Sequence, residues 1–238
     1  MDDKNNYPYD IEINPAGAPN SADVNLLKIA IRQSENCSCK IKLKDGGSGT
    51  GFFSLIPFPD KTMKLRTLMT NHHVLGKSDI EIGKQIQFSI NNEKKQFNIV
   101  IDEKRKVYTN KAFDITIIEI KKEDGIKDDS YLDIDDQIFE EEIQNFINKS
   151  IYLLHYPKGG DANISQGVIK TISIDGYNIH HLCSTDVGSS GTPILYLHNN
   201  KLIGIHKGGE KKQKNWNCGT LLKLPIEKFN ENFINNNL

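Results

Sequence analysis

From Cys39 onward, short apolar or alternating runs are separated by glycine, asparagine, aspartate and lysine. Runs of this length between closely spaced turn residues are typical of strands in barrels and sandwiches. The predicted strands form two sets, at roughly 38–44, 50–56, 65–71, 84–91, 96–102 and 114–120, and at roughly 150–155, 164–174, 177–183, 192–197, 201–206 and 218–223. Because the sets are equal in number, the pattern favours an all-β protein made of two similar six-stranded antiparallel barrels.

Two segments outside these sets show helical spacing instead. Near the amino terminus Ser21 is the predicted N-cap of a helix. Apolar residues then recur about one helical turn apart, at Val24, Leu27 and Ile31. The last segment places Pro225 in a first turn. Apolar residues follow it at the same spacing, at Ile226, Phe229 and Phe233. We therefore expect a carboxy-terminal helix packed on the second barrel.

These elements divide the chain into five segments. We expect an amino-terminal extension at 1–36, a first barrel at 37–122, a connector at 123–149, a second barrel at 150–224, and a carboxy-terminal helix and tail at 225–238. Residues 1 to about 20 contain three prolines and few apolar residues, and are predicted to be an extended arm. The connector carries ten acidic residues and one lysine between Glu123 and Glu142. We interpret it as a solvated link or a short surface helix.

Charge and composition narrow the function classes. The 30 Lys and Arg residues nearly cancel the 31 Asp and Glu residues, which argues against a nucleic-acid partner. No apolar run approaches the roughly 18 residues of a membrane-spanning helix. The polar amino-terminal residues show no signal peptide, so a cytoplasmic location is the expectation. The four cysteines are expected to be reduced, small buried side chains. The sequence does not indicate an oligomeric state.

Three sites could carry nucleophilic chemistry. Gly188–Pro193 places a serine between glycines, which permits a tight turn with exposed backbone N–H groups. Met69–Val74 offers a histidine at the end of a predicted strand, and Phe113–Ile118 offers an aspartate at the start of another. Each could also be an ordinary turn or loop segment. A serine nucleophile needs a general base, and the base needs an orienting carboxylate. The order His, Asp, Ser is the order of chymotrypsin-type proteases.

Six segments in register resemble the chymotrypsin-like serine proteases, the trypsin-like enzymes of the PA clan. The closest similarity is to glutamyl endopeptidases and HtrA-type proteases. The segments are Gly49–Phe52 (G-[ST]-G-F), Thr70–Val74 (T-N-x-H-V), Phe113–Ile118 (D-[IL]-A-[VL]-[IL]), Tyr156–Pro157 (G-Y-P), Gly188–Pro193 (G-N-S-G-x-P) and Leu202–Gly209 (V-I-G-I-H-x-G-G). The resemblance covers roughly residues 40–229. It implies a serine endopeptidase with two barrels, a peptide or protein substrate, and no cofactor or metal.

Carried over residue by residue, the resemblance implies a triad of Ser190 as nucleophile, His73 as general base and acid, and Asp114 as orienting carboxylate. His73 is chosen over His72 because the family histidine directly precedes the valine. The backbone N–H groups of Gly188 and Ser190 would form the oxyanion hole. The family residue before the nucleophile is usually Asn or Asp, and here it is Ser189. Activation through a buried aspartate paired with a newly cut amino terminus is therefore not expected.

The resemblance also implies a specificity pocket. Trypsin-like enzymes that cleave after Lys or Arg carry an aspartate where this chain has Ser184. Glutamyl endopeptidases match it at Thr185 and His206, and Gly208 belongs to the segment that lines the pocket. A hydroxyl and an imidazole can both donate hydrogen bonds to a carboxylate. We predict cleavage after Glu, with Gln or Asp as secondary possibilities. The alternative is that His206 is a satisfied strand histidine and the pocket accepts small residues.

The sequence also bears on a metal site and on an alternative function. The paired histidines lack the H-E-x-x-H or C-x-x-C spacing that would orient ligands on one metal. They are interpreted as surface histidines, and no metal site is predicted. The alternative function is a catalytically inactive binding module of the same fold, which is disfavoured because all three triad candidates are present.

Overall fold

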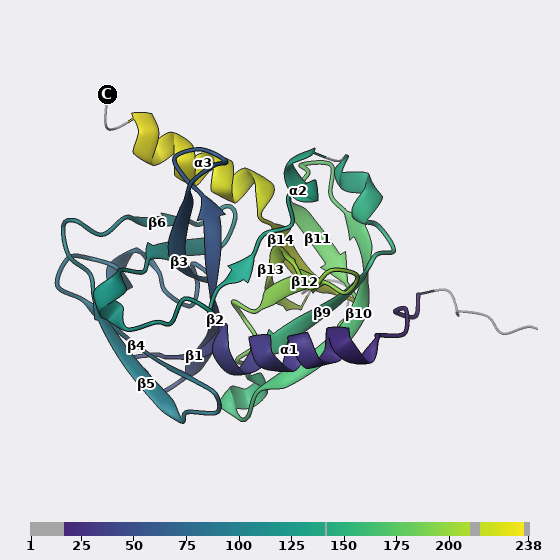
Figure 1. Ribbon diagram of the computed structural model, residues 1–238, viewed down its shortest axis with the longest axis horizontal. Coiled ribbons are helices and arrows are strands. Elements are labelled where there is room, and N and C mark those ends of the chain that lie inside the picture. Colours follow the sequence, from purple (N-terminus) through teal and green to yellow (C-terminus); the bar gives the residue numbers. More distant parts are fainter. Residues whose placement is uncertain (1–16, 141, 210–214, 236–238) are drawn as a thin grey trace, which may run out of the picture.

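Two β units lie side by side in the computed structural model, which describes residues 17–140, 142–209 and 215–235 (Figure 1). The first unit is an eight-stranded sheet with the order β5-β4-β1-β2-β3-β7-β6, and β8 pairs with β2. Its strands are β1 (Ser38–Lys42), β2 (Ser48–Pro57), β3 (Lys64–Thr70), β4 (Gln85–Ile90), β5 (Lys95–Val100), β6 (Val107–Asn110), β7 (Ile115–Glu119) and β8 (Leu132–Asp133).

The second unit is a closed six-stranded antiparallel barrel with the order β10-β11-β14-β13-β12-β9. Its strands are β9 (Ser150–His155), β10 (Asn163–Ile172), β11 (Asn178–His181), β12 (Pro193–Tyr196), β13 (Leu202–Gly209) and β14 (Asn217–Leu221). The predicted two-barrel, mostly β fold is confirmed. The first unit differs in detail, because β6 and β8 were not predicted and its strand path stays open.

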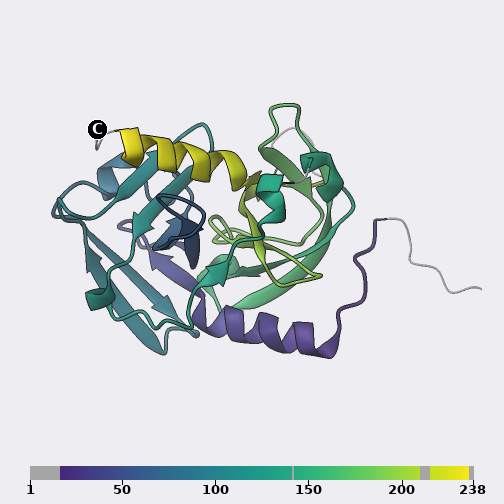
Figure 2. The same ribbon diagram turned by 45° about the horizontal axis from the view of Figure 1, so that its top comes forward.

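The helices lie at the edges of the two units. They are α1 (Val24–Asn36), α2 (Gln137–Glu140) and α3 (Lys223–Asn235), with 3-10 turns η1 (Lys77–Asp79), η2 (Lys122–Asp124), η3 (Ile143–Phe146) and η4 (Pro157–Gly159). Figures 1 and 2 show α1 and α3 on opposite sides of the molecule. Among the described residues, no helix is long and apolar enough to cross a membrane.

Helix α1 begins later than predicted. Ser21 is not the N-cap, because the carboxylate of Asp23 accepts the Asn25 amide at 2.7 Å and takes that role. The helix contacts the second barrel through Gln33, whose side chain accepts the Tyr152 hydroxyl at 2.6 Å. Of the predicted extended arm, residues 1–16 lie outside the described ranges.

Helix α3 follows the second barrel but binds the first unit. Its fully buried Phe229 packs edge to face against Phe58 and Tyr108, with ring centroids 5.5 and 6.0 Å apart. Asn230 donates a hydrogen bond to the Pro57 carbonyl at 3.1 Å. The expectation that this helix packs on the second barrel was therefore incomplete, because its aromatic side chains also pack against the first unit.

The acidic connector is not only a solvated link. Leu132 and Ile134 are buried, and they belong to segments that pair in parallel with β2 and with Leu202 of β13 respectively. Buried Asp135 accepts a hydrogen bond from Asn199 at 2.9 Å. The connector therefore joins both units through backbone pairing, and Asp124 near its start forms an ion pair with buried Arg105 of the first unit. The predicted segment boundaries stay predictions.

Candidate active site

His73 and Asp114 are held together by two hydrogen bonds. Oδ2 of Asp114 lies 2.8 Å from His73 Nδ1, and Oδ1 accepts the His73 amide at 3.0 Å. Asp114 has a left-handed φ of 53°, and Asn71 donates to its carbonyl at 2.9 Å. A carboxylate at Nδ1 leaves Nε2 of a neutral imidazole as the free acceptor. The His73 side chain is 49% exposed, so this nitrogen can meet a substrate.

His72 points elsewhere. Its Nδ1 lies 2.7 Å from the Thr109 hydroxyl on β6, which in turn lies 2.7 Å from the Thr116 hydroxyl. Of the two neighbouring histidines, the structure therefore brings only His73 to Asp114.

Ser190 lies in the turn before β12. Its hydroxyl donates to the Lys207 carbonyl of β13 at 3.1 Å. No hydrogen bond joins Ser190 to His73 in the described part of the chain. Catalytic hydrogen bonds are often formed only when substrate is bound, and rotation about the Cα–Cβ bond of Ser190 moves the hydroxyl.

The turn around Ser190 needs glycine at two positions. Gly188 has φ +89°, and a Cβ atom there would lie 2.8 Å from the Tyr156 carbonyl oxygen. Gly191 has φ +88°, and a Cβ atom there would lie 2.0 Å from the Thr50 carbonyl oxygen. Thr50 binds the same turn, because its amide donates to the Ser190 carbonyl and its hydroxyl to the Gly188 carbonyl, both at 2.8 Å.

The amides of the turn divide into two groups. Those of Ser189 and Gly191 donate to the carbonyls of Asp186 and His206, each at 3.0 Å. Among the described residues, the amides of Gly188 and Ser190 have no hydrogen-bond acceptor. Two unpaired N–H groups beside a serine hydroxyl are suited to hold the oxyanion of a tetrahedral intermediate.

His155 of β9 was not predicted as a site residue, but its imidazole contacts the turn that carries Ser190. Its Nδ1 lies 2.7 Å from the hydroxyl of fully buried Ser189, and its Nε2 lies 2.8 Å from the Ser165 hydroxyl. Burial lowers the pKa of His155 to about 4. A neutral imidazole therefore binds the residue that replaces the family Asn or Asp. His155 directly precedes the Tyr156–Pro157 motif, but nothing in the sequence pairs it with a serine 34 residues away.

The predicted pocket residues differ in exposure. Ser184 is exposed, Thr185 and Gly208 are half-buried, and His206 is 1% exposed. Burial lowers the pKa of His206 well below 6.5. His206 is therefore neutral near pH 7. Its Nδ1 lies 3.1 Å from His181 Nε2.

The hydrogen bonds determine where the protons of this histidine pair lie. The Cys183 amide donates to Nδ1 of His181 at 3.3 Å. A neutral His181 then carries its proton on Nε2 and donates it to Nδ1 of His206. The proton of His206 is consequently on Nε2, so this ring presents a donor and not an acceptor at its far side.

Lys207 is a second residue that the sequence analysis missed. Its ammonium group hydrogen-bonds the Asn178 side chain and lies 6.0 Å from the Tyr177 ring centroid. Burial lowers the pKa of Lys207, and the negative charge of Asp114 acts in the opposite direction. A half-buried cation therefore acts electrostatically on the carboxylate that holds His73.

No metal centre is evident in the described ranges, which contain no group of three or more His, Cys, Asp or Glu side chains placed to hold an ion. The cysteines also lack such a role. Cys37, Cys39 and Cys183 are buried, Cys218 is half-buried, and none is in a disulfide.

Comparison with known proteins places this site in context. Residues 49–205 match the family model of the trypsin-like peptidase domain. This range contains the segments of all three triad candidates. No curated protein matches the chain.

Several solved structures are similar in fold. A serine endoprotease from Yersinia pestis has 15% identity and a TM-score of 0.62, covering 89% of this chain and 68% of that one. The HtrA-type protease AlgW, solved with a tripeptide, has 14% identity and a TM-score of 0.60, covering 87% and 62%. The active form of the Rv3671c protease from M. tuberculosis has 17% identity and a TM-score of 0.57, covering 94% and 92%.

The buried neutral His155 predicts a pH dependence of stability. Its pKa is about 4 in the folded protein against 6.5 when unfolded, so between these values only the unfolded chain binds the proton. The free energy of unfolding should fall by about 3 kcal/mol from this residue as the pH drops from 6.5 to 4. Urea titrations of His155→Gln should show a shallower pH dependence than the wild type, while exposed His198→Gln should not. Equal slopes in all three proteins would contradict the assignment.

Proposed function

Because this chain belongs to the family of trypsin-like peptidase domains, and is therefore a serine endopeptidase, we propose that Ser190, His73 and Asp114 are its catalytic triad. The observation that carries the proposal is the pair of unpaired amides, Gly188 and Ser190, on the turn that also bears the hydroxyl. The His73–Asp114 hydrogen bonds supply the oriented base.

In the proposed mechanism, Ser190 Oγ attacks the scissile carbonyl carbon while His73 Nε2 takes the hydroxyl proton. The Gly188 and Ser190 amides hold the negative oxygen of the tetrahedral intermediate. His73 then gives its proton to the departing amine, which leaves an acyl group on Ser190. A water molecule, deprotonated by His73, hydrolyses this ester and restores the serine. Asp114 stays ionised throughout and stabilises the imidazolium that forms in each half of the reaction.

We also propose a preference for Glu before the scissile bond, with Gln or Asp accepted less well. Two features support it. The half-buried Thr185 hydroxyl precedes the nucleophile by five residues, and the relay from the Cys183 amide through His181 leaves a donor on His206. A neutral N–H donor of this kind can hydrogen-bond a substrate carboxylate without placing a positive charge in the pocket. The Cys218 backbone also hydrogen-bonds this ring, so a substrate carboxylate would have to compete with that contact.

The first test is covalent labelling with a fluorophosphonate probe. The wild type should be labelled, and Ser190→Ala should not, because the probe needs the activated hydroxyl. Exposed Ser78→Ala is the matched control and should be labelled like the wild type. Peptidase turnover should fall by a factor on the order of 10⁶ in Ser190→Ala. Labelling that persists in Ser190→Ala, or is absent from the wild type, would instead support an inactive binding module.

The pocket is tested with peptides that differ only before the scissile bond. Glu should give a kcat/KM at least about tenfold above Leu or Lys. His206→Ala should remove most of this advantage because the imidazole donor is lost, while exposed His198→Ala should keep it. A wild-type preference for Lys would refute the pocket assignment, and a preference for small residues would support the alternative.

Lys207 predicts a shift in the pH profile. Removing a cation that acts on Asp114 makes protonation of the His73–Asp114 pair easier, so the half-point on the acidic side of kcat/KM should move upward by about half a pH unit in Lys207→Met. Lys207→Arg keeps the charge and should restore the wild-type value. A loss of rate with an unmoved half-point would mean that Lys207 acts only through packing.

A further inference from the structure

A large cleft adjoins the proposed oxyanion hole and has no part in the mechanism above. It has a volume of about 920 Å³ and runs from Gly188 between η4 of the second barrel and strands β1, β4 and β5 of the first unit. No residue of β13 lines it. The two units thus flank a second cleft that reaches Gly188.

The direction of a bound peptide follows from the strands around Ser190. Strand β12 pairs with β13 as far as Ile205, and the turn before β12 occupies both backbone groups of His206. Among the described residues, the edge of β13 is therefore open to an added strand from Lys207 onward. The Lys207 carbonyl on this edge lies 3.1 Å from the Ser190 hydroxyl. The acyl side of a substrate therefore extends along the Lys207–Gly209 edge, above the His206 pocket. The leaving-group side must continue away from β13, past Gly188 and into the cleft.

The cleft is lined by an aromatic side chain and by lysines. Half-buried Phe97 stacks on buried Phe88, with ring centroids 5.4 Å apart and an interplanar angle of 15°. Gly46 also lines the cleft, and no heavy atom lies within 4 Å of the position that a Cβ atom would take there, so a peptide backbone can approach. An extended peptide could place a large apolar side chain on Phe97.

Two of the three lysines in the cleft are already neutralised. Lys40 pairs with Glu93 and donates to the Gly159 carbonyl at 2.8 Å. Lys158 lies 3.4 Å from the Asp186 carboxylate. Within the described ranges, the ammonium group of exposed Lys42 forms no hydrogen bond or ion pair, although its charge acts together with that of Lys40 to lower the pKa of Glu93. Three lysines and two carboxylates line the cleft, which therefore has a net positive charge beside an aromatic side chain.

We propose that this cleft binds the segment of the substrate that follows the scissile bond, and that it selects an acidic residue together with a large apolar one. The proposal rests on the proposed function, because the direction of the peptide depends on Ser190. Lys42 is the specificity-determining residue for the acidic side chain, and Phe97, held in place by buried Phe88, is the apolar contact. Peptides with lysine in this segment would meet like charge and bind less well.

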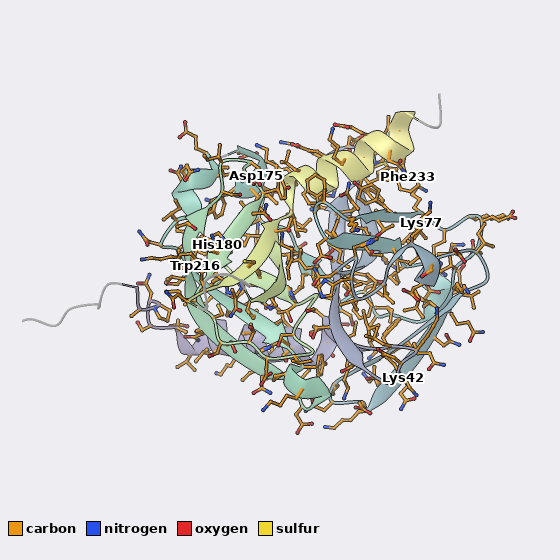
Figure 3. The ribbon with its side chains drawn as sticks, turned by 180° about the vertical axis from the view of Figure 1, so that it is seen from behind. Lys42, Lys77, Asp175, His180, Trp216 and Phe233 are labelled. Carbon is orange, nitrogen blue, oxygen red and sulfur yellow. The ribbon has the colours of Figure 1, made fainter. Side chains whose placement is uncertain are left out.

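The test compares twin peptides that represent the leaving-group side alone, one carrying Phe and Glu and the other Phe and Gln. Their affinities are measured by fluorescence polarisation against the full chain carrying Ser190→Ala, so that no turnover occurs. The Glu peptide should bind about threefold to tenfold more tightly. Adding Lys42→Glu should abolish or reverse this difference. Lys77→Glu makes the same charge change on the same barrel, away from Lys42 (Figure 3), and should preserve it.

A kinetic arm separates this inference from the proposed function. With the wild-type chain, internally quenched peptides sharing one acyl side should show the same Glu-over-Gln ratio in kcat/KM. A chromogenic substrate with a small leaving group should not distinguish Lys42→Glu from Lys77→Glu. The cleft assignment alone would be overturned if hydrolysis were normal and the Glu and Gln peptides bound equally well. The same conclusion would follow if Lys77→Glu lowered the Glu-over-Gln ratio as much as Lys42→Glu does. Lys42-dependent binding without any hydrolysis would overturn the proposed function and, with it, the assignment of the cleft to the leaving-group side, leaving only a peptide-binding cleft selective for acidic residues.

Discussion

The active-site turn depends on one contact between the two β units, made by Thr50 of β2. Its amide and hydroxyl donate to the Ser190 and Gly188 carbonyls, and its own carbonyl accepts the Thr70 hydroxyl at 2.8 Å. The peptide planes of these two carbonyls carry the Ser189 and Gly191 amides, so the Thr50 contact orients the two paired amides on either side of Ser190. Gly191 lets the turn approach Thr50 closely enough for this, because any side chain there would clash with the Thr50 carbonyl. The first unit thereby determines the shape of a loop that belongs to the second.

The interior beneath this turn is held by neutral groups. His155 and the His181–His206 pair are buried, and burial lowers the pKa of each ring. Neutral imidazoles can each donate one hydrogen bond and accept another, so they link serines and backbone amides without the desolvation cost of a buried charge. Ser189 fits this arrangement in place of an ionisable side chain. Burying neutral histidines also makes the folded state less stable in acid, because each of these rings takes up a proton when the chain unfolds below pH 6.5.

The parts that the sequence predicted are those with local signals. All six strands of the second barrel were recognised from short apolar runs, and the Thr70–Val74, Phe113–Ile118 and Gly188–Pro193 motifs needed no long-range information. Contacts between distant residues were not predictable in the same way. Two-residue β8 has no periodicity, and the roles of His155 and Lys207 arise only when β9 and β13 come beside the turn. Ser21 failed as an N-cap because Asp23 is a competing acceptor two residues later. The motifs therefore predict which groups are candidates for catalysis, whereas only the pairing of distant strands determines how these groups are held.

The near-zero net charge of the chain gives no guide to the surface that a substrate meets. Acidic residues of the connector are used elsewhere, as where Asp124 pairs with buried Arg105 and Asp128 with Arg66, and no connector residue lines the cleft beside Gly188. Lysines of β1 and η4 do line it, and two of the three have carboxylate partners. The Lys42 ammonium has no direct carboxylate partner in the described residues, and the three lysines of the cleft outnumber its two carboxylates, so an acidic peptide side chain would meet a net positive charge there. Specificity on the leaving-group side then depends on which charges of the cleft are paired with opposite charges nearby. The chain-wide total of 30 basic and 31 acidic residues does not show this pairing.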